Sequence, residues 1–399
     1  MNSFACRVFQ CCFGAGARLL PWRTPEVYTG GGNLLRVADI LRENGLRRPF
    51  VIASRRQCAD EHFRRLQEVL DMQDILLSIF SAVEPNPSVE TVEKIAEQYR
   101  IDRCDCFLVI GGGSPMDAAK AAAALLVRPN RSLSSLAGLL KVRRRIPPFI
   151  AVPTTAGTGS ETTIAAVITG RDHRKYAVSD LCLIPRYAIL DPTLSAGLPP
   201  HITAETGMDA LTHAVEAYLS RFYNTRKTRE QAERAVVTIF SHLERAYRDG
   251  ASLPDRAAML QASFDAGAAF TRASVGNVHA IAHTLGGLYG TSHGLANAVL
   301  LPIVLEDYGA AAYPRLARLA HLVGIQEASA EASARAFIAE IRAMNARMGI
   351  PDHFDCIRSE DIPLMASWAC REANPVYPVP VIYDQARFAR VIERSCVKP

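Results

Sequence analysis

The chain has 399 residues, of which 49% are hydrophobic and 21% charged, and its formal net charge is +5. A chain of this length is expected to form two domains, and these proportions are ordinary for a globular enzyme. The densest basic run, residues 141–145, contains no aromatic residue and indicates a solvated loop rather than a nucleic-acid surface, and no apolar stretch is long enough for a transmembrane helix.

The N-terminal segment, residues 1–22, is rich in small and apolar residues, which Arg7, Gln10 and Arg18 interrupt. It has no clear hydrophobic region or cleavage site of a signal peptide. The pattern predicts a short amphipathic helix, and weak membrane contact is the alternative. Residues 1–25 are therefore treated as an N-terminal extension whose role the sequence leaves open.

The next part of the chain, residues 26–195, alternates between strand-like and helix-like runs. Five apolar runs predict strands, at residues 49–53, 75–81, 106–110, 149–153 and 187–190. Three periodic runs predict helices, at residues 58–70, 88–99 and 115–126, with Ser88 as a possible N-cap of the second. Strands that alternate with helices imply a parallel sheet covered on both faces, as in a dinucleotide-binding domain.

The remainder, residues 196–399, is predicted to be all-helical. Long runs with helical apolar spacing occur at residues 232–248, 256–272 and 328–348, and Gly349 follows the end of the last run. We therefore place the domain boundary near residue 195.

Three consecutive glycines, residues 111–113, follow the predicted strand at 106–110 and open a helix. Glycine lets backbone N–H groups approach a pyrophosphate closely, and a helix N-terminus favours its negative charge. Pro115 suits the first turn of that helix. The motif is neither G-x-G-x-x-G nor a Walker A sequence, and a tight turn without a ligand is the alternative.

A second glycine loop, residues 153–163, also follows a predicted strand and is dense in hydroxyl side chains. Such a loop can form hydrogen bonds with a ribose, a phosphate or a nicotinamide amide, although Ser160 and Thr163 would also suit a capped helix start. Two loops of this kind at strand ends in one α/β domain favour a dinucleotide site.

The residues with the most specific chemistry are Asp209, His213, His279, His283 and His293. Asp209 and His213 are four residues apart, so on a helix they share a face. Asp209 lies in an otherwise apolar stretch, where an unpaired carboxylate would be costly. One carboxylate with three imidazoles suits a divalent transition metal. Spacing alone does not separate His279 from His283, and histidines of the core or the surface are the alternative.

Together these motifs resemble those of the iron-containing (group III) alcohol dehydrogenase family. The matching segments are residues 85–87, 111–120, 153–161, 191–192, 206–216 and 279–297, and their order and separation agree as well as their letters. The resemblance extends from about residue 26 to the C-terminus. It implies an α/β N-terminal dinucleotide-binding domain plus an all-α C-terminal domain, the dehydroquinate synthase-like fold, with a metal in the cleft between them.

The resemblance also implies a role for individual residues. The metal ligands would be Asp209, His213, His279 and His293, while His283 would lie beside the nicotinamide as a candidate proton relay. The cofactor would be bound by Asn86, by Gly112, Gly113, Ser114 and Asp117 near the pyrophosphate, by Thr154, Thr155 and Thr158, and by Lys175 near the ribose.

One departure from the family pattern concerns cofactor choice. Members that prefer NAD often carry an Asp after the first strand, whereas Ser54, Arg55 and Arg56 follow residues 49–53 here. A hydroxyl and two guanidinium groups would attract the 2′-phosphate that an Asp would repel, which favours NADPH over NADH. The alternative is that the two arginines are solvated residues at a helix start.

We therefore predict a metal-dependent, NAD(P)-linked alcohol dehydrogenase or aldehyde reductase. The metal, Fe²⁺ or else Zn²⁺, would act as a Lewis acid on the oxygen of a small alcohol or aldehyde while hydride passes to or from C4 of the nicotinamide. A hydroxyacid–oxoacid transhydrogenase, a dehydroquinate synthase-like lyase and a non-catalytic binding protein are the alternatives. Residues 264–276, Tyr289 and residues 372–377 are candidates for substrate contacts.

Two further expectations concern the redox environment and the oligomeric state of the protein. The ten cysteines show no repeated C-x-x-C spacing, which favours a reduced, cytoplasmic protein. A homodimer is what the family resemblance implies.

Overall fold

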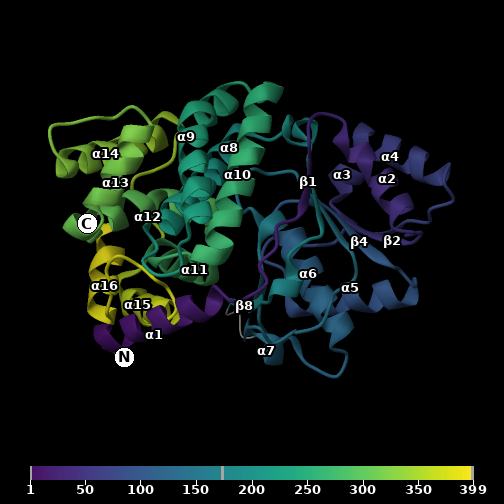
Figure 1. Ribbon diagram of the computed structural model, residues 1–399, viewed down its shortest axis with the longest axis horizontal. Coiled ribbons are helices and arrows are strands. Elements are labelled where there is room, and N and C mark those ends of the chain that lie inside the picture. Colours follow the sequence, from purple (N-terminus) through teal and green to yellow (C-terminus); the bar gives the residue numbers. More distant parts are fainter. Residues whose placement is uncertain (1, 172–174, 397–399) are drawn as a thin grey trace. The chain divides into compact units, whose positions relative to one another are not determined.

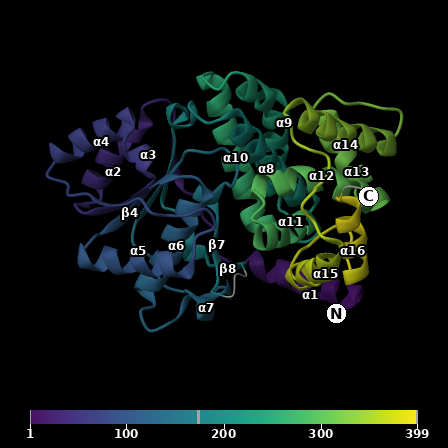
Figure 2. The same ribbon diagram turned by 180° about the vertical axis from the view of Figure 1, so that it is seen from behind.

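The computed structural model describes residues 2–171 and 175–396. The chain divides into two compact units (Figures 1 and 2). An α/β unit comprises residues 21–197 and 251–264, and a helical unit comprises the described residues of 1–20, 198–250 and 265–399. The division after residue 197 lies close to the predicted boundary. Two segments differ from the expected domains, because residues 2–20 join the helical unit and residues 251–264 join the α/β unit.

The α/β unit is built on a six-stranded parallel sheet in the order β1-β9-β6-β4-β2-β3. These strands are β1 (Glu26–Thr29), β9 (Tyr187–Leu190), β6 (Phe149–Pro153), β4 (Cys106–Gly111), β2 (Pro49–Ala53) and β3 (Ser78–Phe80). The four strands β2, β4, β6 and β9 are buried along their whole length, as expected for a parallel sheet covered on both faces. The predictions for these four are confirmed, whereas the predicted strand at 75–81 is limited to β3.

Alternate residues of the sheet face two separate cores. Phe50, Phe107 and Val109 pack with α5 (Val89–Ile101) and α6 (Gly113–Val127). Val51 and Leu108 pack on the other face with α2 (Arg36–Glu43) and α4 (Glu61–Asp71). These two cores explain why the buried strands read as continuous apolar runs.

The predicted helix at residues 58–70 corresponds to α4, which begins at Glu61, and the first predicted residue, Cys58, is the last residue of a separate short helix, α3 (Arg55–Cys58). The chain breaks between them because the Asp60 side chain accepts a hydrogen bond from the His62 N–H and caps α4. The predicted cap of α5 is confirmed, since the Ser88 side chain accepts from the Thr91 N–H.

A second, three-stranded sheet was not predicted. Its order is β5-β8-β7, where β5 is Gly138–Leu139, β8 is Lys175–Ser179 and β7 is Ala165–Thr169, and the short helix α7 (Leu133–Leu136) precedes it.

The buried Lys120 of α6 ties the second glycine loop to the start of β7. Its ammonium group donates to the carbonyl oxygens of Ser160 and Thr163, at 2.6 and 2.9 Å, and to that of Ala165 at 3.2 Å.

The helical unit contains no strand among its described residues, as predicted. Its helices are α1 (Ser3–Ala17), α8 (Pro200–Leu219), α9 (Arg226–Arg248), α11 (Asn277–Tyr289), α12 (His293–Tyr308), α13 (Tyr313–Leu322), α14 (Ala330–Arg347), α15 (Ile362–Ala373), α16 (Gln385–Arg394) and the second part of α10 (Leu253–Ala273). Gly349 follows α14 in the left-handed conformation, with φ 72°.

Two observations concern the chain as a whole. None of the described helices combines the length and the apolar character needed to cross a membrane. All ten cysteines, every one of which lies in the described part of the chain, are free thiols.

Candidate metal centre

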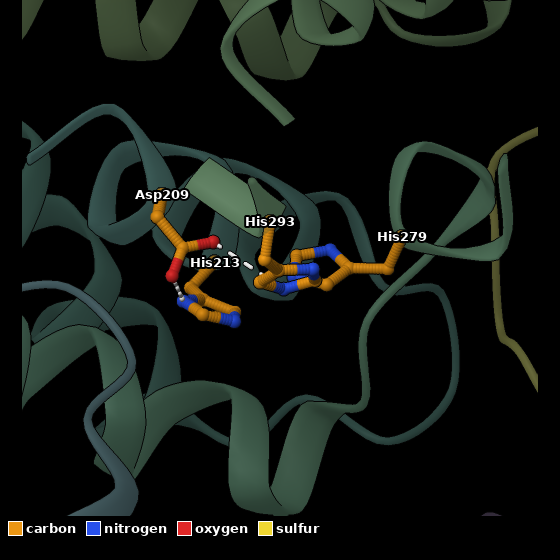
Figure 3. A group of neighbouring side chains, drawn as sticks. All are labelled: Asp209, His213, His279 and His293. Atoms are coloured by element: carbon orange, nitrogen blue, oxygen red, sulfur yellow. Dashed lines mark ion pairs between the residues drawn. The ribbon is translucent and has the colours of Figure 1, made fainter. Parts of the chain in front are cut away.

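Four side chains from three helices converge in the helical unit (Figure 3). Asp209 and His213 lie one turn apart on α8, His279 lies on α11, and His293 is the first residue of α12. Each offers one oxygen or nitrogen, and these atoms all lie within 4.8 Å of one another. The first three side chains are at most 5% exposed, whereas His293 is 31% exposed, so the group is open to solvent on the His293 side.

The centre collects acceptor atoms around one point. Oδ2 of Asp209 lies 3.9 Å from Nδ1 of His213, and Oδ1 of the same carboxylate lies 3.6 Å from Nε2 of His293. The amide nitrogen of Asn297 donates to Asp209 Oδ1 at 2.7 Å and lies 3.2 and 3.1 Å from Nε2 of His279 and His293. A carboxylate oxygen and imidazole nitrogens that lie this close together are a donor set that fits a divalent transition metal.

Glu216 fixes the orientation of His279. Its carboxylate lies 2.6 Å from Nδ1 of His279 and also accepts from the backbone N–H groups of Gly276 and Val278, at 2.7 and 2.8 Å. Burial lowers the pKa of His279 well below its usual range, which keeps the imidazole neutral. With Nδ1 facing Glu216, the lone pair of Nε2 faces the centre, as in many metal sites where a carboxylate supports a histidine ligand.

Sequence reasoning assigned no role to Glu216, although a signal was present. Glu216 follows Asp209 by seven residues and His213 by three, so all three share one face of α8. Gly276 is required for the close approach, because a Cβ at that position would lie 2.7 Å from Glu216 Oε1. Burial raises the pKa of Glu216, while the N–H groups that donate to it lower the pKa and favour the carboxylate form.

His283 lies beside the group of four and not within it. It follows His279 by one turn on α11, and its ring stacks on that of His293 with the centroids 5.3 Å apart. Its Nδ1 lies 2.6 Å from Oε1 of Glu372, and both side chains are partly exposed. The structure thus separates the two histidines that spacing could not distinguish.

The predicted cofactor residues lie in the α/β unit, at the carboxyl ends of the adjacent strands β2, β4 and β6 or close in space to those ends. Three of them form one cluster. The N–H of Asn86 lies 3.3 Å from the hydroxyl of Ser114, and the ammonium group of Lys175 donates to Asn86 Oδ1 at 2.7 Å. Asn86 has φ 57°, a left-handed conformation that asparagine tolerates better than most residues.

The two glycine loops pack against each other. A Cβ on Gly112 would lie 3.0 Å from Thr155 Oγ1, and one on Gly113 would lie 2.8 Å from Thr158 Cγ2. Gly112 is the N-cap of α6, and no side chain caps that helix. The glycines are therefore needed for packing as well as for any approach of a phosphate.

Two predicted cofactor residues have protein partners of their own. The carboxylate of Asp117 accepts from the Ser160 hydroxyl at 2.9 Å and from the Val167 N–H at 3.1 Å, so it braces the second glycine loop against β7. Ser54 is the N-cap of α3 in a capping box with Gln57, whose amide donates to Thr154 Oγ1 at 3.1 Å.

Comparison with known proteins agrees with this fold. Residues 24–192 match the model of the iron-containing alcohol dehydrogenases, and residues 203–394 match that of the C-terminal region of the same family. The chain belongs to the iron-containing alcohol dehydrogenase family. Its class of activity is therefore that of a metal-dependent alcohol dehydrogenase or aldehyde reductase.

Individual relatives cover most of the chain. A 1,3-propanediol dehydrogenase of Klebsiella pneumoniae is 40% identical over 306 residues, which are 75% of this chain and 78% of the relative. Alcohol dehydrogenase 4 of Schizosaccharomyces pombe is 35% identical over 356 residues, 88% of this chain and 83% of the relative. The crystal structure of a 1,3-propanediol oxidoreductase superimposes with a TM-score of 0.89 at 33% identity, covering 95% of this chain and all of that one.

Proposed function

We propose that this protein is an NAD(P)-linked alcohol dehydrogenase that holds iron, or else zinc, in the group Asp209, His213, His279 and His293. The observation that carries the proposal is the convergence of these four buried or partly buried side chains, with Nε2 of His279 directed into the group by Glu216. The ligands together carry a single negative charge. A divalent cation held there would act as a Lewis acid toward the oxygen of the substrate.

His283 is the proton relay in this proposal. Because its Nδ1 faces Glu372, its Nε2 is the atom that would take the proton of the substrate hydroxyl in oxidation and return it in reduction. An imidazole suits this task since it changes its protonation state near neutral pH.

The α/β unit would bind the nicotinamide cofactor, which exchanges the hydride. Asn86, Ser114 and Lys175 lie together, and the glycine loop Gly112–Gly113 packs on Thr155 and Thr158, which supports binding of one extended ligand along the strand ends. In that arrangement Asp117 acts mainly by holding the second glycine loop. Cytoplasmic location and a homodimer are part of the proposal and rest on the free cysteines and on the family.

The activity is tested with the purified protein after separate reconstitution with Fe²⁺ and Zn²⁺. A panel of small alcohols and aldehydes, including 1,3-propanediol because a relative is named for it, is assayed with both nicotinamides. We expect reduced cofactor to be consumed with at least one aldehyde. Reduction of an oxoacid by a hydroxyacid without turnover of free cofactor would instead support the transhydrogenase. No reaction with any pair would contradict the proposal.

A preference for NADPH is proposed from the residues that follow β2. Ser54, Arg55 and Arg56 are all exposed at the start of α3. Ser54→Asp keeps the helix cap, since Asp caps helices as well as Ser does, but it adds a negative charge where the 2′-phosphate would bind. We expect the ratio of kcat/KM for NADPH to that for NADH to fall by roughly tenfold or more. A tenfold change corresponds to about 1.4 kcal/mol.

Ser132→Asp is the matched control for this experiment. Ser132 is also an exposed N-cap serine, at the start of α7, and its replacement should leave the ratio unchanged. A ratio that Ser54→Asp does not move would show that Ser54 lies away from the cofactor phosphate.

A further inference from the structure

The N-terminal helix α1, for which the sequence indicated no role, is packed into the helical unit beside α15 and α16 (Figures 1 and 2). Cys6, Gln10 and Gly14 are buried and four residues apart, so they form one face of the helix. A Cβ on Gly14 would lie 2.9 Å from the carbonyl oxygen of Phe222, which shows how closely the helix approaches its neighbour. The ring of Phe13 packs on Tyr223, with the centroids 5.2 Å apart.

Two side chains of α1 bind the segment of residues 375–380, which follows α15. The guanidinium group of Arg7 donates to the carbonyl oxygens of Val379 and Pro380, at 2.7 and 2.8 Å. The amide of the buried Gln10 donates to the carbonyl oxygens of Pro375 and Tyr377, at 3.0 and 2.7 Å. Arg7 also donates to Oε1 of Gln10 at 2.9 Å, so the two side chains hold each other in place.

Two further groups of the helical unit bind the same segment. The Tyr223 hydroxyl donates to the carbonyl oxygen of Val376 at 2.9 Å, and the Arg221 N–H donates to that of Pro378 at 2.8 Å. Every carbonyl oxygen from 375 to 380 therefore accepts a hydrogen bond, and α1 supplies the donor for four of them. Prolines at three of these positions have no N–H for hydrogen bonding, so the segment depends on donors from its neighbours.

The clamped segment carries Tyr377, which reaches toward His283. The Tyr377 hydroxyl donates to Oε1 of Glu372 at 2.7 Å, and Nδ1 of His283 lies 2.6 Å from the same oxygen. Burial, together with the nearby carboxylate, raises the pKa of Tyr377 well above its usual range, so the hydroxyl stays a donor. The side chain of Glu372 is 33% exposed, and without Tyr377 it would be free to turn toward water.

We propose that α1 is a positioning element of the active site: by holding residues 375–380 it fixes Tyr377, and through Tyr377 it holds Glu372 against Nδ1 of His283. The imidazole then keeps one orientation and one tautomer, with Nε2 directed away from Glu372. This inference rests on the proposed role of His283 as the proton relay. Glu372, Tyr377, Arg7 and Gln10 act through His283 and are positioning residues.

The first test replaces the contacting side chains one at a time and assays each variant loaded with metal. Glu372→Ala and Tyr377→Phe should keep the metal content and the KM for the alcohol and lower kcat. A positioned proton-transfer group contributes about 100- to 10,000-fold, so we expect a loss of roughly 10- to 100-fold for Glu372→Ala and a smaller one for Tyr377→Phe. Added formate should restore part of kcat to Glu372→Ala, which a merely structural role would not explain. Arg371→Gln, at an exposed neighbouring position, is the control.

The second test asks whether α1 acts through Glu372. The double variant Arg7→Gln/Gln10→Leu should lower kcat in the wild-type background and have little further effect when Glu372 is already alanine, since residues that act as a unit are not additive. Arg7→Lys should restore part of the loss. Arg18→Gln, an exposed position just after α1, should change nothing.

Several outcomes would overturn the inference. If the α1 variants lost the same fraction of kcat with and without Glu372, α1 would act elsewhere than through Glu372. An unchanged kcat in Tyr377→Phe would show that Tyr377 does not hold Glu372 in place, and this result does not depend on whether the α1 variants fold. If His283→Ala lowered kcat but neither Glu372→Ala nor Tyr377→Phe did, the inference about α1 would be rejected while the proposed relay role of His283 would stand. An unchanged rate in His283→Ala would reject the proposed relay itself.

Discussion

Replacing His279 with alanine is expected to abolish metal binding and activity, whereas replacing His283 with alanine should leave the metal in place and lower the rate. His279 is 2% exposed and directs Nε2 into the group of four, so its removal takes away a ligand atom that water would replace poorly at a buried site. His283 lies outside that group, and its loss should cost roughly 100-fold or more in kcat, the usual contribution of a proton-transfer residue.

The two variants are compared by elemental analysis and by kcat after identical reconstitution. His321→Ala, a histidine on α13 remote from the group, is the control and should bind metal as the wild type does. If His279→Ala and His283→Ala lost metal to the same extent, the division between ligand and relay would be wrong.

Gly294→Ala is expected to damage the same centre through the backbone. Gly294 follows His293 in the first turn of α12, and a Cβ there would lie 2.7 Å from the carbonyl carbon of Glu205 on α8 and closer still to its oxygen. Because the obstacle is main chain, no side chain can rotate to relieve the contact. The start of α12 must move away from α8 and carry His293 away from Asp209, at a cost of about 1–3 kcal/mol in stability.

Unfolding in urea and titration with Fe²⁺ or Zn²⁺ measure the two effects, and we expect metal affinity to fall by about tenfold or more, the change that roughly 1.4 kcal/mol produces. Gly287→Ala is the matched control, because Gly287 lies in α11 with open space around its Cβ position. Removing a glycine from a helix interior should leave the protein unchanged or stabilise it by up to about 1 kcal/mol. Equal behaviour of the two variants would mean that α12 adjusts without disturbing the centre.

The elements that could be predicted from the sequence are those whose pattern has one physical cause. The strands at 49–53, 149–153 and 187–190 were predicted to the residue, because a strand covered on both faces is apolar throughout. β1 was missed, since it is a four-residue edge strand with exposed ends. The sheet of β5, β7 and β8 was missed because its strands are short or only partly buried.

Residue type and spacing indicated a metal site at Asp209 and the nearby histidines, and the family resemblance then divided His279 from His283, but the neighbours of these residues were not predicted. Glu216 could have been noticed from its spacing to Asp209 and His213, but an acidic residue in a helix is common, and nothing in the sequence distinguishes Glu372 from a solvated carboxylate until the helices are packed. Residues 372–377 were expected to contact the substrate, and in the structure two of them bind each other next to His283. Asp117 was expected at the cofactor, and its two oxygens are bound by the protein itself.

The placement of the four candidate ligands on three different helices couples occupancy of the centre to folding. A ligand that binds only the folded state stabilises it by RT ln(1 + [L]/Kd), about 2.7 kcal/mol at a free concentration one hundred times Kd. Metal held by α8, α11 and α12 would therefore resist their separation, and the unfolding midpoint of the helical unit would follow the free metal concentration of the medium. Stabilities of variants are comparable only when that concentration is buffered.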